Sequence, residues 1–124
     1  MAMTAPLRAD ETKAAVSKER PQAAPAVQAT FELLMDCIEN DKYAAFLVAV
    51  DDGFKAALTE KVFKSVVEQV APRQKQGFQS IYLEELNQQS YKVHLWKLTF
   101  TDGGDDMLVR LSIKDGKVSG LFLQ

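Results

Sequence analysis

The chain has 124 residues, of which 47% are hydrophobic and 26% charged, a balance typical of one ordinary globular domain. A formal charge of −2 excludes a strongly basic surface over the whole chain, so we expect no nucleic-acid partner. The single cysteine, Cys37, and single histidine, His94, exclude an internal disulfide and multi-cysteine or two-histidine metal sites. We expect neither a metal nor a cofactor.

The first 24 residues differ in composition from the rest. All eleven aromatic residues lie from Phe31 onward, and three of the four prolines lie at or before Pro25. A segment without aromatic anchors cannot offset its ordering entropy, so we interpret residues 1–24 as a mobile arm and residues 25–124 as a single domain. Charges recur through residues 8–20, which excludes the apolar run of a secretory signal, and no segment is apolar enough to span a membrane. We therefore expect a cytoplasmic protein with no membrane partner.

The apolar residues between Pro25 and Ala71 recur with the period of a helix. The first stripe predicts a helix that begins at Pro25 and ends before Asn40-Asp41; it comprises Val27, Phe31, Leu34 and Ile38. A short second helix follows, with Tyr43, Phe46, Leu47 and Val50 inward, and Asp51-Asp52-Gly53 breaks it. We expect Thr59 to cap a third helix, with Val62, Phe63, Val66, Val67 and Val70 inward, and Pro72 to end it.

From Gly77 the apolar period changes to two, which predicts strands over residues 78–87, 90–101, 106–114 and 117–124. Asp115-Gly116 predicts a tight hairpin turn between the last two strands. A four-residue loop over 102–105 pairs Trp96 with Leu111, and a turn at Gln88-Gln89 pairs Ile81 with Trp96. These turns make the sheet an antiparallel meander.

Alternation along these strands assigns the side chains to two faces of the sheet. On one face eleven of twelve residues are apolar, so we expect it to pack on the helices. That face comprises Ile81, Leu83, His94, Trp96, Leu98, Phe100, Met107, Val109, Leu111, Ile113, Val118 and Phe122. The other face is mixed and includes five large aliphatic residues: Val93, Leu95, Leu108, Leu121 and Leu123.

This order of elements resembles the cone-shaped fold of nuclear transport factor two and ketosteroid isomerase. The resembling stretches are FELLMDCIENDKYAAFLVAVDDGFKAALTEKVFKSVVEQV, GFQSI and VRLSIKDGKVSGLFL, and their wording is most similar to small bacterial domains of unknown function in that superfamily. The resemblance covers residues 27–123. It implies an α+β fold, in which three helices pack on a curled four-stranded antiparallel sheet, with room for a pocket inside the cone, frequent homodimers, relatives alone or attached to hydrolases, and no assigned reaction.

His94 lies on the apolar face near the end of its strand. A histidine there acts as a general acid or base, or is a core-edge residue with a satisfied ring nitrogen. The resemblance implies that isomerases of this superfamily use an acidic base and a hydrogen-bond donor within the cone. The matching strand positions carry no acid here; they are Trp96, Leu98, Met107, Val109 and Leu111.

The leading hypothesis is a non-enzymatic binding or interaction module of unknown ligand. Its cone would hold a small apolar ligand in a pocket lined by Tyr43, His94, Trp96, Leu98 and Val109. The alternative is a small-molecule enzyme, isomerase- or dehydratase-like, that uses His94 in the same pocket, with Tyr43 or Tyr82.

The mixed face predicts a homodimer, because monomers seldom leave a contiguous apolar patch open. The predicted register places Lys97 and Arg110 opposite each other on neighbouring strands of this face. They either contact a carboxylate of the second copy, with Glu84 as candidate, or extend into solvent. The predicted interface comprises Val93, Leu95, Lys97, Leu108, Arg110, Leu121 and Leu123.

Two clusters of acidic residues and the cysteine fit structural roles better than metal binding or catalysis. Asp36, Glu39 and Asp41 fit solvated or capping positions at the end of a helix. The Asp102–Asp106 run fits a hairpin loop and lacks the spacing of a calcium-binding loop. Cys37 has no basic neighbour to lower its pKa and is expected to pack in the core.

Overall fold

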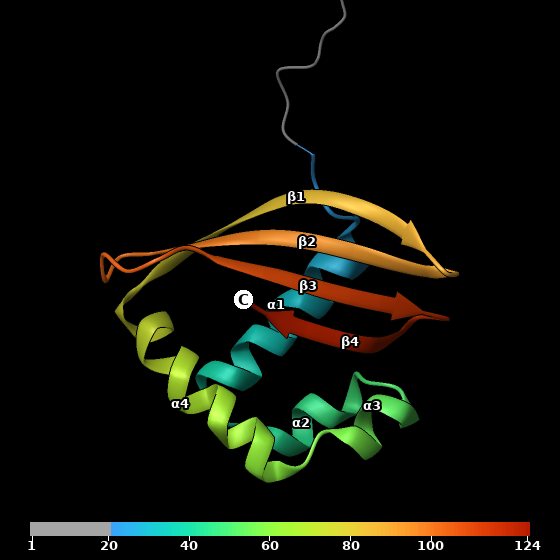
Figure 1. Ribbon diagram of the computed structural model, residues 1–124, viewed down its shortest axis with the longest axis horizontal. Helices are drawn as coiled ribbons and strands as arrows, with labels where there is room; N and C mark the ends of the chain where they lie inside the picture. The colour runs from blue at the N-terminus through green and yellow to red at the C-terminus, as the bar shows by residue number, and fades with distance from the viewer. Residues whose placement is uncertain (1–20) are drawn as a thin grey trace, which may run out of the picture.

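The computed structural model describes residues 21–124, which form four helices followed by a four-stranded antiparallel sheet (Figure 1). The helices are α1 (Pro25–Glu39), α2 (Tyr43–Val48), α3 (Asp52–Ala57) and α4 (Glu60–Gln76). The strands are β1 (Phe78–Gln88), β2 (Tyr91–Phe100), β3 (Met107–Lys114) and β4 (Lys117–Leu123), adjacent in chain order. The predicted α+β class and antiparallel sheet are confirmed. Residues 1–20 of the predicted mobile arm lie outside the described residues.

The helices number four rather than the predicted three. The predicted break after the second helix is present, since α2 ends at Val48, but Asp51 also starts a helix that was not predicted. Its Oδ1 accepts a hydrogen bond from the Phe54 N–H at 2.8 Å and caps α3. The predicted cap of α4 is confirmed, since the Thr59 hydroxyl accepts from the Val62 N–H at 3.2 Å. No helix within residues 21–124 combines the length and apolar character needed to cross a bilayer.

The prediction that Pro72 ends the last helix is wrong, because α4 continues to Gln76. Pro72 is exposed, so water can solvate the carbonyl that its missing N–H leaves without a helical partner. Beyond it, the buried Gln74 donates from Nε2 to the Met35 carbonyl of α1 at 3.0 Å. This tertiary hydrogen bond holds the last turn of α4 against α1.

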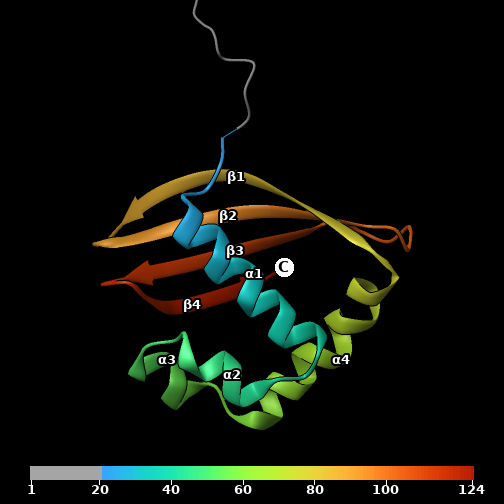
Figure 2. The same ribbon diagram turned by 180° about the vertical axis from the view of Figure 1, so that it is seen from behind.

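Helix α1 crosses one face of the curled sheet, and that face forms the core (Figure 2). The ring of Phe31 stacks on Trp96 with centroids 4.1 Å apart and planes 6° from parallel. Trp96, Leu98, Val109 and Leu111 are each at most 1% exposed, as expected for the apolar face. The stripe of α1 therefore fills the inside of the curved sheet.

The register of β2 with β3 differs from the prediction by two residues, so Trp96 pairs with Val109 rather than Leu111. An even shift preserves the faces. The β1 register is wrong by one residue at its start: the turn falls at Gln89-Ser90, both with positive φ, and a bulge lies at Leu83. Phe78, Ser80 and Tyr82 consequently take the core side that was predicted for Ile81 and Leu83, with Tyr82 opposite Trp96.

A second bulge changes the end of β4. Ile113 pairs with Val118 as predicted, but Ser112 pairs with Gly120, which leaves Ser119 as the extra residue. Every later side chain on β4 therefore lies on the face opposite to the predicted one. Leu121 and Leu123 pack against the core, and Phe122 points out of it with 59% of its surface exposed.

Candidate functional site

The residues predicted to line a pocket lie instead in the packed interior. His94, Trp96, Leu98 and Val109 are between 0% and 5% exposed. Helix α1 fills the space that the predicted cone pocket required, through the stacking of Phe31 on Trp96. Tyr43 is half-buried beside this core and donates its hydroxyl to the Leu58 carbonyl at 2.7 Å.

His94 has a polar partner inside the core. Its Nδ1 lies 2.9 Å from the Tyr82 hydroxyl, and the two rings are 6.0 Å apart. Burial lowers the pKa of His94 below its ordinary value, against the opposing charge of Glu85, so the ring is neutral at pH 7. These contacts match the core-edge interpretation, in which a partner satisfies one ring nitrogen.

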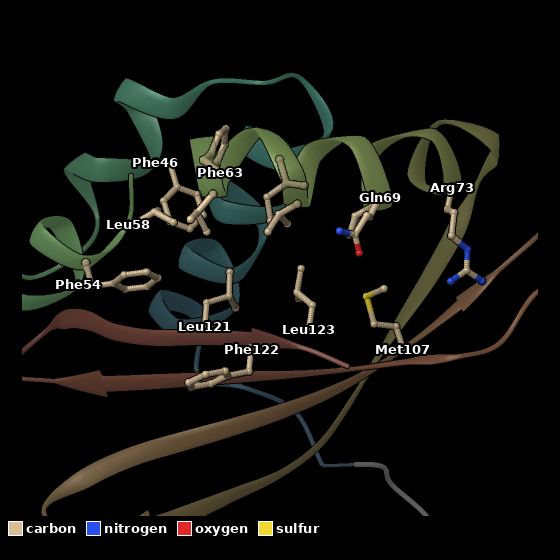
Figure 3. Close-up of a pocket in the computed structure, with 15 residues that line it drawn as sticks. Phe46, Phe54, Leu58, Phe63, Gln69, Arg73, Met107, Leu121, Phe122 and Leu123 are labelled. Atoms are coloured by element: carbon tan, nitrogen blue, oxygen red, sulfur yellow. The ribbon is translucent and has the colours of Figure 1, made fainter. Parts of the chain in front are cut away.

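A cavity of about 530 Å³ lies elsewhere, between helices α3–α4 and the β4 edge of the sheet (Figure 3). Most of its lining is aliphatic or aromatic. Figure 3 shows Leu121 and Leu123 of β4 pointing toward α4 across the open space. The cavity is lined by Ile38, Phe46, Phe54, Ala57, Leu58, Val62, Phe63, Val66, Gln69, Val70, Arg73, Met107, Leu121, Phe122 and Leu123.

Polar groups gather at one end of this cavity, where Gln69 and Arg73 project from α4 (Figure 3). The Arg73 guanidinium is already engaged: its Nε donates to Asp102 Oδ2 at 2.6 Å and its Nη2 to the Asp105 carbonyl at 2.6 Å. It also stacks over the Phe100 ring at 3.9 Å. Arg73 therefore fastens the β2–β3 loop to α4 and closes that end of the cavity, while Gln69 remains as a neutral polar group at the wall.

The contact with Arg73 also affects the pKa of the Asp102 carboxyl. Its hydrogen bond with Arg73, and then that with the Gly104 N–H at 2.8 Å, lower the pKa of this carboxyl below its ordinary value. The predicted loop role of the Asp102–Asp106 run is consistent with this geometry. Within residues 21–124, no three histidine, cysteine or acidic side chains gather as metal ligands would.

The other titratable candidates also have structural partners. Asp36 accepts hydrogen bonds from Asn40 and Lys42, and Asp41 forms an ion pair with Lys64. Cys37 is fully buried, and burial followed by the charge of Asp36 raises the pKa of its thiol. A thiol with a raised pKa is a poor nucleophile, in keeping with the predicted packing role.

The predicted dimer surface is partly corrected. Leu121 and Leu123 lie on the core side, because of the bulge in β4, and Val93 is only 2% exposed within a single copy. By alternation the outer face keeps five of the predicted residues, of which Val93 is buried; they are Val93, Leu95, Lys97, Leu108 and Arg110. Arg110 donates to Gln88 Oε1 at 2.6 Å, rather than reaching Glu84.

Sequence reasoning missed this cavity because it assigned the whole apolar stripe of α4 to the core. Only Phe63 and Val70 of that stripe are buried; Val66 is half-buried and Val62 is 49% exposed, and both line the cavity. A signal was present in the width of the stripe. The adjacent apolar pairs Val62-Phe63 and Val66-Val67 spread around the helix further than one contact face needs.

No protein-family model, curated protein or solved structure matches this chain. The cavity and the strand that borders it are therefore the basis for the function proposed next.

Proposed function

We propose that this chain is a non-enzymatic binding module that takes an apolar ligand in the cavity between α4 and β4. The observation that carries the proposal is the cavity itself: about 530 Å³, lined mostly by apolar side chains, with the polar side chains of Gln69 and Arg73 at its wall. Ligand pockets in proteins commonly occupy about 300–1,000 Å³ and combine an apolar lining with a few polar groups.

The enzymatic alternative has less support. It depends on His94, which is 5% exposed, hydrogen-bonded to Tyr82 and separate from the residues that line the cavity. A general acid or base has to reach a substrate proton within hydrogen-bond distance. Among residues 21–124, the one charged side chain at the cavity wall is that of Arg73, which is held by Asp102 and the Asp105 carbonyl. Binding is therefore the better-supported function.

The experiment is a titration with 1-anilino-8-naphthalenesulfonate, an anionic dye whose aromatic rings fluoresce in apolar surroundings, and the dye is excited directly. Val66→Trp places a large ring in the cavity, whereas Val48→Trp adds the same ring at a position that is 74% exposed and outside the lining. We expect Val66→Trp to weaken dye binding about tenfold or more, and Val48→Trp to leave it unchanged, with far-ultraviolet circular dichroism preserved in both.

Two results would contradict this function. The first is a wild-type protein that gives no saturable dye fluorescence. The second is equal dye affinity in the two tryptophan variants, which would place the dye on a surface away from the cavity.

A further inference from the structure

We propose that the ligand is an extended peptide segment of a partner protein, with apolar side chains at alternate positions, which adds to the sheet as a fifth strand beside β4. This inference rests on the proposed function, because the peptide's side chains would fill the same cavity. Strand addition of this kind draws affinity from main-chain hydrogen bonds and specificity from pockets for alternate side chains.

The first observation is that some backbone N–H and C=O groups of β4 point away from the sheet. Leu108 and Gln124 exchange both backbone hydrogen bonds, at 2.7 and 2.9 Å. Such pairs alternate along an antiparallel ladder, so the partners Arg110–Phe122 continue the bonded set. The N–H and C=O groups of Leu121 and Leu123 therefore point away from β3. No backbone hydrogen bond within residues 21–124 reaches these groups from another segment.

The second observation is that the other half of this edge is already paired. The Val118 N–H donates to the Ala49 carbonyl at 3.1 Å, and the Asp51 N–H donates to the Val118 carbonyl at 2.8 Å. Val50 thereby forms a parallel bridge with Val118. The chain itself supplies one strand-like contact on this edge and then turns into α3 (Figure 1). The Leu121–Leu123 half receives no backbone hydrogen bond from another segment within residues 21–124, and both leucines line the cavity.

The third observation is the contrast between the two edges of the sheet. Proteins guard exposed edges with charges and bulges. The β1 edge has both, with Glu84 and Glu85 beside the bulge at Leu83. The β4 edge has no charged residue from Val118 to Leu123, and its bulge at Ser119 precedes the open half. An apolar, unguarded edge is a template for another strand.

The side chains around this edge fit the alternation of an added strand. Alternate residues of a strand lie about 6.7 Å apart and point to the same side. Residues on one side of the added peptide would enter the cavity beside Leu121 and Leu123, which line it together with Val66. Residues on the other side would pack against Phe122, whose ring is 59% exposed at this edge. The added strand would thus cover the exposed ring of Phe122.

The test begins with a library of capped heptapeptides that carry Val, Leu or Phe at three alternate positions and Ser or Lys between them. The tightest binder is then measured against Leu123→Pro and Leu123→Ala by fluorescence anisotropy. Both variants lose the leucine side chain, but only the proline loses the outward N–H, at an edge position that tolerates proline. We expect Leu123→Pro to bind about tenfold more weakly than Leu123→Ala, with circular dichroism preserved.

The same peptide provides an independent readout that does not depend on the fold of a variant. N-methylation at the residues whose N–H groups face β4 should abolish binding, whereas N-methylation at the alternate residues should be tolerated. We also expect the amides of Leu121 and Leu123 to exchange with solvent more slowly when the peptide is bound.

The outcomes separate this inference from the function on which it rests. If the dye binds in the cavity but no library peptide does, or if N-methylation acts without alternation, strand addition is wrong while the apolar pocket stands. If neither dye nor peptide binds, both proposals fail. If light scattering shows a dimer that Leu123→Pro dissociates and Leu123→Ala does not, a second copy occupies the edge and the partner-peptide assignment is overturned.

Discussion

Replacing Phe31 by alanine tests whether α1 fills the inside of the curved sheet. Phe31 is 2% exposed and stacks on Trp96 at 4.1 Å, so its removal leaves a cavity in the centre of the core. Truncation of a buried phenylalanine costs about 3–5 kcal/mol, a range that includes the lost aromatic contact. Alanine is the better helix former by roughly 0.5 kcal/mol, so we expect a net loss of about 3–4 kcal/mol in the free energy of unfolding.

Urea denaturation followed by circular dichroism measures this loss, with Leu33→Ala as the matched control on the same helix. Leu33 is 44% exposed, and its truncation should change the free energy of unfolding by only about 0.5 kcal/mol. In thermal denaturation, the Phe31 variant should melt at least about 12 °C below wild type, at roughly 4 °C per kcal/mol for a domain of this size. A loss under about 1 kcal/mol would refute the packing described here and would reopen the cone as a site.

Three further measurements follow from the contacts of single side chains. Because the hydrogen bond with Arg73 lowers the pKa of Asp102, its stabilising contribution is complete above the ordinary carboxyl value of 3.8 and is lost as the pH falls through the lower folded-state value. In wild type the urea midpoint of unfolding should therefore fall as the pH is lowered through that range, and Asp102→Asn should make this fall smaller. Burial lowers the pKa of His94, so the unfolded chain binds this proton more readily, and stability should decline as the pH falls below 6.5. His94→Gln should remove that decline, and an unchanged pH profile would mean that the ring is solvated. We also predict a homodimer through the outer sheet face, which light scattering would detect as twice the 13.8 kDa chain mass, and Leu95→Glu with Leu108→Glu should dissociate it; a monomer at micromolar concentration would contradict it.

The sequence alone was enough to predict the elements that local rules control. The period of Val27, Phe31, Leu34 and Ile38 determines α1 and its buried face, because side chains three or four residues apart share one side of a helix. Asp115-Gly116 predicted the last hairpin turn, and both residues have the positive φ that such a turn requires. The burial of Trp96, Leu98 and Val109 also followed from alternation, since the β2–β3 register was wrong by an even number of residues.

The tertiary structure decided what alternation alone could not. A single bulge reverses every later side chain on its strand, and neither Leu83 nor Ser119 carries a local signal strong enough to place one. The bulge in β4 moved Leu121 and Leu123 from the predicted dimer surface into the cavity and turned Phe122 outward.

Helix α4 shows the same dependence on distant contacts. Pro72 is a strong local stop, yet the helix continues to Gln76, with Gln74 bonded to α1 and Arg73 bonded to the β2–β3 loop. Local propensity differs by only about 3 kcal/mol for a proline, and long-range hydrogen bonds and burial can offset that amount. The candidate site depends on this outcome, because its walls come from segments far apart in the sequence, which the packing of α4 on α1 brings to opposite sides of the cavity.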